Sequence, residues 1–351
     1  MKKISEFIWP LVGLAAVVVS GYFLYQELKT TSLSAIWGAI LAIPPHRILL
    51  ALVSTLVAYA ALAWYDRIAL LHLGVRHISW LFVSLCSFTT YALSHNIGAS
   101  VFSGALVRYR AYTAKGLSAA QVAVLVALCS FTFFLGTVSL GGLTLVLDPH
   151  LLSRLEGKLP AVFTDPKTAL IVGIGMLAFV ALYVAGSILR LPPLHIRSFK
   201  LEYPRPGIMG RQLIAAPLEL LGAAGIIYFA LPQSMGVDFL TVLAIFLASF
   251  SLALASHAPG GLGVFELVFI TAMQITDNAQ KDAVIAAVII FRVFYLWLPL
   301  LASIVIVLMF ERSRLAAAVG KTQPEAVPEP PVIAPGLDAH EIEHKLKEKA
   351  V

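Results

Sequence analysis

Long apolar runs dominate the chain and set its predicted architecture. A helix needs about 20 such residues to cross a bilayer core of about 30 Å. Six runs approach that length, and we predict membrane-spanning helices at residues 8–25, 48–65, 118–147, 169–189, 212–230 and 283–310. A shorter stretch, residues 33–43, places its large apolar side chains at i, i+3 and i+4 spacing. We expect it to form a short interfacial helix that ends at Pro44-Pro45.

Two further apolar stretches, residues 78–107 and 239–275, are interrupted in the middle and resemble each other at an offset of 162 residues. The sequence SLCSFTTYALSHNIG begins at Ser84, and FLASFSLALASHAPG begins at Phe246. Six of the 15 aligned positions are identical, including a Ser-His-x-x-Gly motif at the interruption. Because the chain has only nine histidines, apolar composition alone would rarely align such a pair. We predict two related broken hairpins; two ordinary kinked spans, with glycines at close helix contacts, are the alternative.

Glycine, proline and polar residues supply the predicted breaks. These residues are Asn96, Gly98, Gly104, Pro259, Gly260, Gly261 and Gly263. A broken helix exposes backbone N–H and C=O groups, which are tolerated at membrane depth only beside protein or in a wet cavity. N–H groups freed at the N-terminus of a half-helix favour an anion such as a lipid phosphate.

The distribution of lysine and arginine predicts the topology. If the N-terminus is inside and each hairpin enters and leaves on one side, inside segments carry 14 of these residues and outside segments carry 6. This agrees with the positive-inside rule better than two single spans do, since those would place Arg108, Arg110 and Lys115 outside. The unit span–hairpin–span then occurs twice with opposite orientation, at residues 48–147 and 212–310. Inverted repeats of this kind are typical of secondary transporters.

Composition agrees with a membrane protein. Hydrophobic residues make up 59% of the chain and charged residues 13%, about half of the roughly 25% that soluble domains carry. This excludes a soluble multidomain enzyme and a disordered chain. We therefore predict an all-α polytopic membrane protein, with a transmembrane domain at residues 1–315 and a disordered, Pro-rich, charged cytoplasmic tail at 316–351. The net charge of +6 fits cytoplasmic loops, and we expect no nucleic-acid partner.

Ionisable residues at membrane depth are candidates for function. Arg292 lies ten residues into the last predicted span and could bind a phosphate through its guanidinium fork. Glu219 could pair with Arg292 or line a cavity, and Glu266 could cap the second break. The matched His95 and His257 could share a site. Two histidines without a nearby cysteine or carboxylate make a poor metal centre, so we expect no metal and no cofactor.

Charges at the predicted span ends form a second group. Asp66, beside Arg67 at the end of the second span, fits an interfacial anchor. Arg108, Arg110 and Lys115 follow the first hairpin on the inside. They could recruit anionic headgroups, or they could form a plain positive-inside loop.

Cysteine and histidine motifs add little. Cys86 and Cys129 lie in apolar runs and fit small buried side chains, so no disulfide framework is predicted. His340-Glu341-Ile342-Glu343-His344 formally matches a zinc-protease helix, but it follows a Pro-rich tract in the charged tail. We assign this motif no function.

Several motifs resemble the membrane region of the lysylphosphatidylglycerol synthases, a flippase-like family, and most of all its stand-alone inner-membrane members. They are HAPGGLGVFE from His257, FRVFY from Phe291 with Pro299, Tyr65-Asp66 and Arg108-Tyr109-Arg110. The resemblance covers about residues 5–315 and implies a membrane protein that moves a lipid between leaflets. Full-length synthases add a soluble aminoacyl-transferase domain after this region, whereas about 40 residues follow it here. We therefore expect no lysylphosphatidylglycerol synthesis, and the lipid stays open.

Together these features predict a flippase- or scramblase-like lipid transporter of the bacterial inner membrane, with both termini cytoplasmic. The expected headgroup site comprises Arg292, Glu219, Glu266, His95, His257 and Tyr295, and headgroup recruitment involves Asp66, Arg108 and Arg110. The expected partners are membrane lipids, chiefly an anionic phospholipid, with a homo-oligomer or a partner enzyme as further options. Because the chain has no P-loop motif, active transport would draw on an ion gradient, the membrane potential or a partner. The alternative is a non-catalytic membrane partner of a lipid- or glycan-modifying enzyme.

Overall fold

The computed structural model describes residues 32–97, 100–156, 161–191, 194–196, 199–201 and 203–320. The chain forms two compact units, residues 1–306 and 307–351. The second unit contributes only the end of the last helix to the described residues. The fold and the sites below belong to the first unit.

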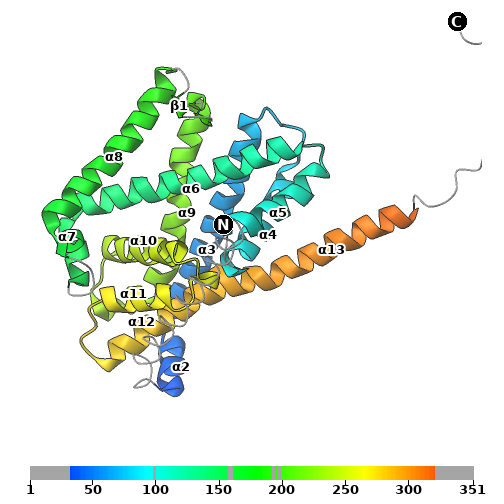
Figure 1. The fold of residues 1–351 in the computed structure, drawn as a ribbon. Helices are drawn as coiled ribbons and strands as arrows, with labels where there is room; N and C mark the ends of the chain where they lie inside the picture. Colours follow the sequence, from blue (N-terminus) through cyan, green and yellow to red (C-terminus); the bar gives the residue numbers. More distant parts are fainter. Residues whose placement is uncertain are drawn as a thin grey trace, which may run out of the picture. The chain divides into compact units, whose positions relative to one another are not determined.

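Five helical stretches are long and apolar enough to cross a membrane (Figure 1). They are α3 (Pro45–His72), α6 (Ala119–Leu147), α8 (Pro166–Ile188), α9 (Pro206–Ala230) and the continuous stretch Asn278–Met309. That stretch comprises α12 (Asn278–Phe291), the π-helix η4 (Arg292–Trp297) and the first part of α13 (Leu298–Gly320). Five of the six predicted spans are thus confirmed, and the sixth, 8–25, lies outside the described residues. The protein is an all-α polytopic membrane protein.

Proline and capping side chains set where these helices begin. Pro45, Pro166 and Pro206 stand in the first turn of α3, α8 and α9, where the missing N–H has no helical partner to lose. Ser118 and Gln121 form a reciprocal capping box at the start of α6. The predicted interfacial helix is α2 (Leu33–Leu41), and none of its residues is buried.

Short elements connect the long helices. They are η1 (Pro149–Leu155), α7 (Ala161–Thr164), η2 (Gln233–Met235) and an antiparallel pair, β1 (Leu194–Ile196) and β2 (Phe199–Leu201). The helix α13 continues to Gly320, beyond the predicted tail boundary at residue 316. The rest of the predicted tail lies outside the described residues.

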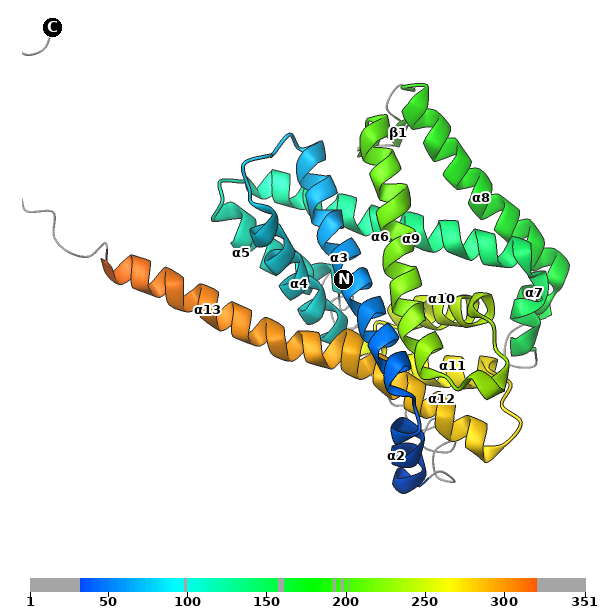
Figure 2. The same ribbon diagram turned by 180° about the vertical axis from the view of Figure 1, so that it is seen from behind.

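Each interrupted stretch forms two helices that pack against each other, as both views show (Figure 2). The first hairpin is α4 (Trp80–Ile97) and α5 (Ser100–Thr113); the second is α10 (Phe239–Ala255), the short η3 (Pro259–Gly261) and α11 (Val264–Ala272). The nine residues of α11 extend about 14 Å, less than half of a hydrocarbon core of about 30 Å. At the mouth of the first hairpin, the His77 ring lies 3.2 Å from the Lys115 carbonyl oxygen. Two single kinked spans are therefore wrong.

The break of the second hairpin lies where the sequence predicts it. In the first hairpin Asn96 lies in the last turn of α4, and Gly98 lies outside the described residues. His257, Gly260, Gly261 and Gly263 all adopt positive φ, at 55°, 60°, 63° and 79°. This region favours glycine because a Cβ atom crowds the backbone there. Gly104, in contrast, lies inside α5, where an added Cβ would be 2.6 Å from Ser94 Oγ. It permits close packing of α4 against α5 and breaks nothing.

The two halves pack in a reciprocal pattern. The first helices of the halves, α3 and α9, lie against each other, and an added Cβ on Gly222 would be 2.9 Å from Ser54 O and Ala58 N. The helix α4 of the first hairpin contacts η4 of the second half, and α10 of the second hairpin contacts α6 of the first. The order helix–hairpin–helix occurs twice along the chain, first from α3 to α6 and again from α9 to α12. The opposite membrane orientation of the two halves stays a prediction.

Candidate functional site

Arg292 contacts residues at the break of the second hairpin. It begins η4 and is 5% exposed. Its Nε donates to Glu266 Oε1 in an ion pair, and its Nη1 donates to Gly260 O at 3.0 Å. The second oxygen of Glu266 accepts from Gly263 N at 2.8 Å. The guanidinium and the carboxylate thus satisfy backbone groups that the broken helix would otherwise leave unpaired.

The end of α4, in the first hairpin, reaches the same place. A Cβ added to Gly260 would lie 3.6 Å from the carbonyl oxygens of both His95 and Asn96. Asn96 Nδ2 donates to Ala92 O at 2.7 Å and to Leu296 O in η4 at 3.1 Å. The end of α4 and the break of the second hairpin, which are far apart in the sequence, therefore meet beside the π-helix.

Tyr295 is the centre of a buried polar cluster on the same π-helix. Its hydroxyl donates to Glu219 Oε1 at 2.5 Å, and its ring stacks on His95 with centroids 5.3 Å apart. The Tyr59 hydroxyl donates to Tyr295 O at 2.9 Å. That carbonyl needs a donor because Pro299, four residues later, has no N–H to complete an α-helical bond. The cluster joins α3, α4, α9 and η4 at membrane depth.

Two buried atoms of this cluster lack a partner among the described residues. Glu219 Oε2 and His95 Nδ1 make no hydrogen bond to this part of the chain, and Glu219 is 1% exposed. Such groups are rare in folded proteins, and each asks for a physical explanation.

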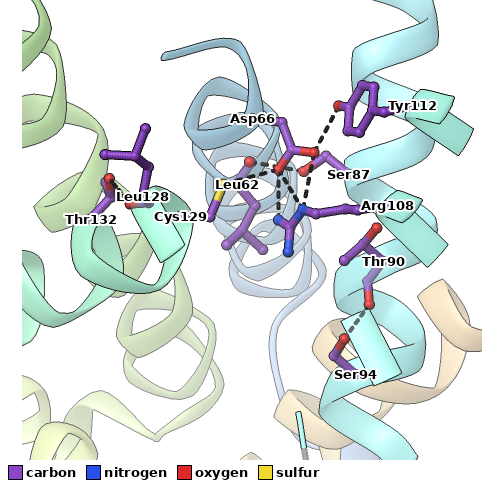
Figure 3. Close-up of polar contacts among 10 residues, drawn as sticks. All are labelled: Leu62, Asp66, Ser87, Thr90, Ser94, Arg108, Tyr112, Leu128, Cys129 and Thr132. Carbon is purple, nitrogen blue, oxygen red and sulfur yellow. Dashed lines mark hydrogen bonds and ion pairs between the residues drawn. The ribbon is translucent and has the colours of Figure 1, made fainter. Parts of the chain in front are cut away.

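A second buried cluster, centred on Asp66, ties the first hairpin to α3 and α6 (Figure 3). Asp66 is 0% exposed, and Arg108 Nη2 donates to its Oδ1 at 2.6 Å. The Tyr112 hydroxyl donates to Oδ2 at 2.8 Å, and Cys129 Sγ lies 3.4 Å from Oδ1. The Arg108 guanidinium also lies over the Tyr91 ring, 4.9 Å from its centroid. Arg108 and Tyr112 thus both donate to the Asp66 carboxylate.

The family model described as "Lysylphosphatidylglycerol synthase TM region" matches residues 11–303. The chain belongs to this family. The match includes both hairpins, both buried clusters and the π-helix, so the family assignment applies to the whole membrane fold described above.

Curated relatives match most of the chain. An uncharacterized protein of Synechocystis sp. is 28% identical over 301 residues, 85% of this chain and 90% of that protein. The inner membrane protein YbhN of Escherichia coli is 28% identical over 317 residues, 88% of this chain and 92% of YbhN. A phosphatidylglycerol lysyltransferase of Staphylococcus epidermidis is 26% identical over 94 residues, 26% of this chain and 11% of that protein.

The structure brings only part of the predicted headgroup site together. Glu219 contacts Tyr295, while Arg292 contacts Glu266, so the predicted alternative of a Glu219–Arg292 pair is wrong. His95 joins the Tyr295 cluster, but His257 is exposed and its Nδ1 lies 2.9 Å from Ala255 O.

The sequence predicts that Asp66 is an interfacial anchor and that Asp66 and Arg108 recruit headgroups. The structure corrects this prediction, because both side chains are buried. The helix α3 continues to His72, six residues past Asp66, so Asp66 lies within the helix and not at its end. Buried there, it binds Arg108, which is 5% exposed. Arg110 is exposed on α5, as a recruiting residue must be.

Sequence reasoning missed several members of both clusters. Tyr59, Tyr91 and Tyr112 are tyrosines in apolar runs, where nothing distinguishes a buried hydroxyl with a partner from an interfacial ring. Cys129 is buried as predicted, yet its thiol faces the Asp66 carboxylate. Among the residues that the structure describes, no three His, Cys, Asp or Glu side chains group into a metal site.

Proposed function

We propose that this protein transports a lipid across the bacterial inner membrane as a flippase- or scramblase-like carrier. The observation that supports this most directly is the meeting of two broken hairpins, one from each half of the chain, at a buried polar cluster. Transporters with repeated halves place their sites where such interrupted helices meet, because freed backbone groups there can bind a polar solute.

The second halves of both hairpins add an anion-friendly element. The helices α5 and α11 begin directly after the interruptions of the two apolar stretches. Unpaired N–H groups and the helix dipole favour a negative charge at this position. An anionic phospholipid headgroup fits this field, while its acyl chains stay in the bilayer.

Arg292 is the residue that we assign to the phosphate. In the described conformation its donors go to Glu266, Gly260 and Gly261. When the two tips separate, a lipid phosphate replaces the two glycine carbonyls and takes the guanidinium in a two-point contact. Substrate binding and opening of the second break are then one event.

The relatives agree with a role in lipid handling. The phosphatidylglycerol lysyltransferase is named for an enzyme that acts on a phospholipid, and YbhN is named as an inner membrane protein. We propose the same membrane for this chain, with transport and no covalent chemistry.

The test is reconstitution of the full chain into liposomes that carry headgroup-labelled phospholipids and receive a membrane-impermeant quencher. We expect an anionic headgroup class to reach the outer leaflet faster than in empty liposomes. Arg292→Ala should abolish this movement, and Arg292→Lys, which keeps the charge but loses the fork, should reduce it. Arg76→Ala, at an exposed loop position, is the matched control and should behave as the wild type.

Equal lipid movement in protein-containing and empty liposomes would refute transport, and so would full activity of Arg292→Ala.

One structural observation favours the alternative of a non-transporting partner. Three donors of Arg292 are already occupied within the protein, as in a static scaffold. Stable co-purification with a lipid- or glycan-modifying enzyme whose activity falls on deletion of this chain would support that alternative.

A further inference from the structure

The carboxyl group of Glu219 has no counter-ion among the residues that the structure describes. It is almost completely buried near the middle of α9, and one oxygen, Oε1, accepts from the Tyr295 hydroxyl. The other oxygen, Oε2, has no hydrogen-bond partner in this part of the chain. Arg292, three residues before Tyr295 on η4, directs its guanidinium to Glu266 and the second break.

The groups that face Glu219 are hydroxyls and aromatic rings. From α3, the Tyr59 hydroxyl donates to Tyr295 O, and the Tyr65 hydroxyl donates to Ala216 O, three residues before Glu219. From η4, Tyr295 supplies the only hydrogen bond to Glu219 among the described residues.

The remaining elements against α9 bring no positive charge to Glu219. The helix α10 has no ionisable residue, and the described part of α12 carries Lys281 and Asp282 only at its first turn. On α8, Tyr183 donates to Gln212, two turns before Glu219. On α6, Cys129 faces Asp66. The carboxyl group of Glu219 is therefore buried, with the Tyr295 hydroxyl as its hydrogen-bond donor among the described residues.

An ionised carboxylate in this position is strongly disfavoured. Burying a charge without a partner forfeits its hydration, and such a group becomes neutral instead. A metal cation would need several oxygen ligands around Oε2. Among the described residues Oε2 has no hydrogen-bond partner, and no group of side chains there could hold a metal ion. The one cation that fits is a proton.

We propose that Glu219 is a proton-binding site that couples lipid movement to the proton gradient. In the described conformation the carboxyl group carries a proton on Oε2. When the hairpin tips separate, water reaches the cluster, the O–H bond breaks, and the proton passes to water, which leaves a carboxylate. Because Tyr295 and Arg292 share one π-helix, the charge on Glu219 acts on the helix that carries the phosphate-binding arginine. The coupling rests on the proposed transport function, whereas the protonation itself does not.

Infrared difference spectroscopy of the purified full chain in lipid nanodiscs tests the protonation. At neutral pH we expect a carboxylic C=O band that shifts in heavy water and is absent in Glu219→Gln. Tyr295→Phe removes the donor to Oε1, so the band should move in frequency and persist. This shift identifies the carboxyl group even if Glu219→Gln folds poorly. A wild-type spectrum without a protonated carboxyl band overturns the proposal.

Liposomes with an imposed pH gradient test the coupling. We expect the gradient to change the rate of lipid movement several-fold for the wild type, and the ratio of rates with and without the gradient to fall to one for Glu219→Gln. An unchanged ratio in the variant overturns coupling through Glu219. If the wild type moves no lipid, transport fails and the coupling fails with it, while the infrared band still decides whether Glu219 is protonated.

Discussion

Asp66 and Arg108 form a buried ion pair that joins α3 to α5. Their attraction in a low-dielectric interior roughly offsets the loss of hydration, so the pair adds little net stability. Removal of one partner is different, because it leaves the other charge buried and uncompensated.

We predict that Asp66→Asn lowers the free energy of unfolding by about 3–5 kcal/mol, since Arg108 then lacks a counter-ion. The double variant Asp66→Leu/Arg108→Met should recover much of this loss because it removes both charges. Glu156→Gln, at an exposed position, should change stability by less than about 0.5 kcal/mol. Denaturant unfolding in detergent measures all three. A double variant no more stable than Asp66→Asn would show that the pair contributes through more than its charges.

Depth in the membrane could be predicted for the important charges, but their partners could not. Arg292, Glu219 and Glu266 all stand out as ionisable residues in apolar runs, and all are largely buried. Which carboxylate Arg292 binds depends on the rotation of η4, where π-helical geometry changes the angle between successive side chains. No residue pattern in the sequence marks that change. The Asp66 error has a similar origin, since the apolar run ends before the helix does.

At the scale of elements, small residues set how closely the helices approach. The α3–α9 contact is tight because Gly222 has no side chain to separate the two backbones. The sequence shows the glycines, yet only the fold distinguishes those at contacts from those that face open space.

Gly222→Ala and Gly175→Ala are a matched pair that tests this contact. A Cβ on Gly222 would approach the α3 backbone to 2.9 Å, so we expect a loss of about 1–3 kcal/mol of stability. Gly175 lies in α8 with nothing within 4 Å, and alanine there should leave stability unchanged or raise it by up to about 1 kcal/mol. Thermal unfolding in the same detergent compares them. Equal effects at both positions would contradict the close α3–α9 packing.

A glycine at the second break can be compared in the same way with a glycine elsewhere that has the same φ. Gly261 and Gly236 both have φ of 63°, but a Cβ on Gly261 would lie 2.8 Å from Ala253 Cβ, whereas nothing lies within 4 Å of Gly236. Both alanine variants should lose about 1–2 kcal/mol from the left-handed conformation. We expect Gly261→Ala to lose more, and to slow lipid movement in liposomes, because the clash displaces the hairpin tip. Equal losses of stability would show that α10 and α11 separate without strain.

At the scale of the molecule, the pattern of spans and breaks was largely predictable and the assembly of the breaks was not. The apolar runs and the repeated Ser-His-x-x-Gly motif locate the elements because each depends on local sequence. The contact between Asn96 and Leu296 depends on how two distant halves pack. Repetition suggests that the halves are related, but it does not place one hairpin tip against the other.

Opposite orientation of the two halves is the last prediction, and it follows from the hairpins having both ends on one side. The first hairpin is flanked by Arg76 and Lys115, and the second by Gln233 and Thr276, all exposed. We expect cysteine at either of the first two positions to react with a membrane-impermeant maleimide only from the cytoplasmic face, and at either of the last two only from the opposite face. Native Cys86 and Cys129 are buried and give little background. Inside-out and right-side-out vesicles supply the two faces. Reaction of all four positions from one face would disprove the inverted repeat. It would also disprove an arrangement in which one hairpin enters the membrane from each face and the two meet at one central site.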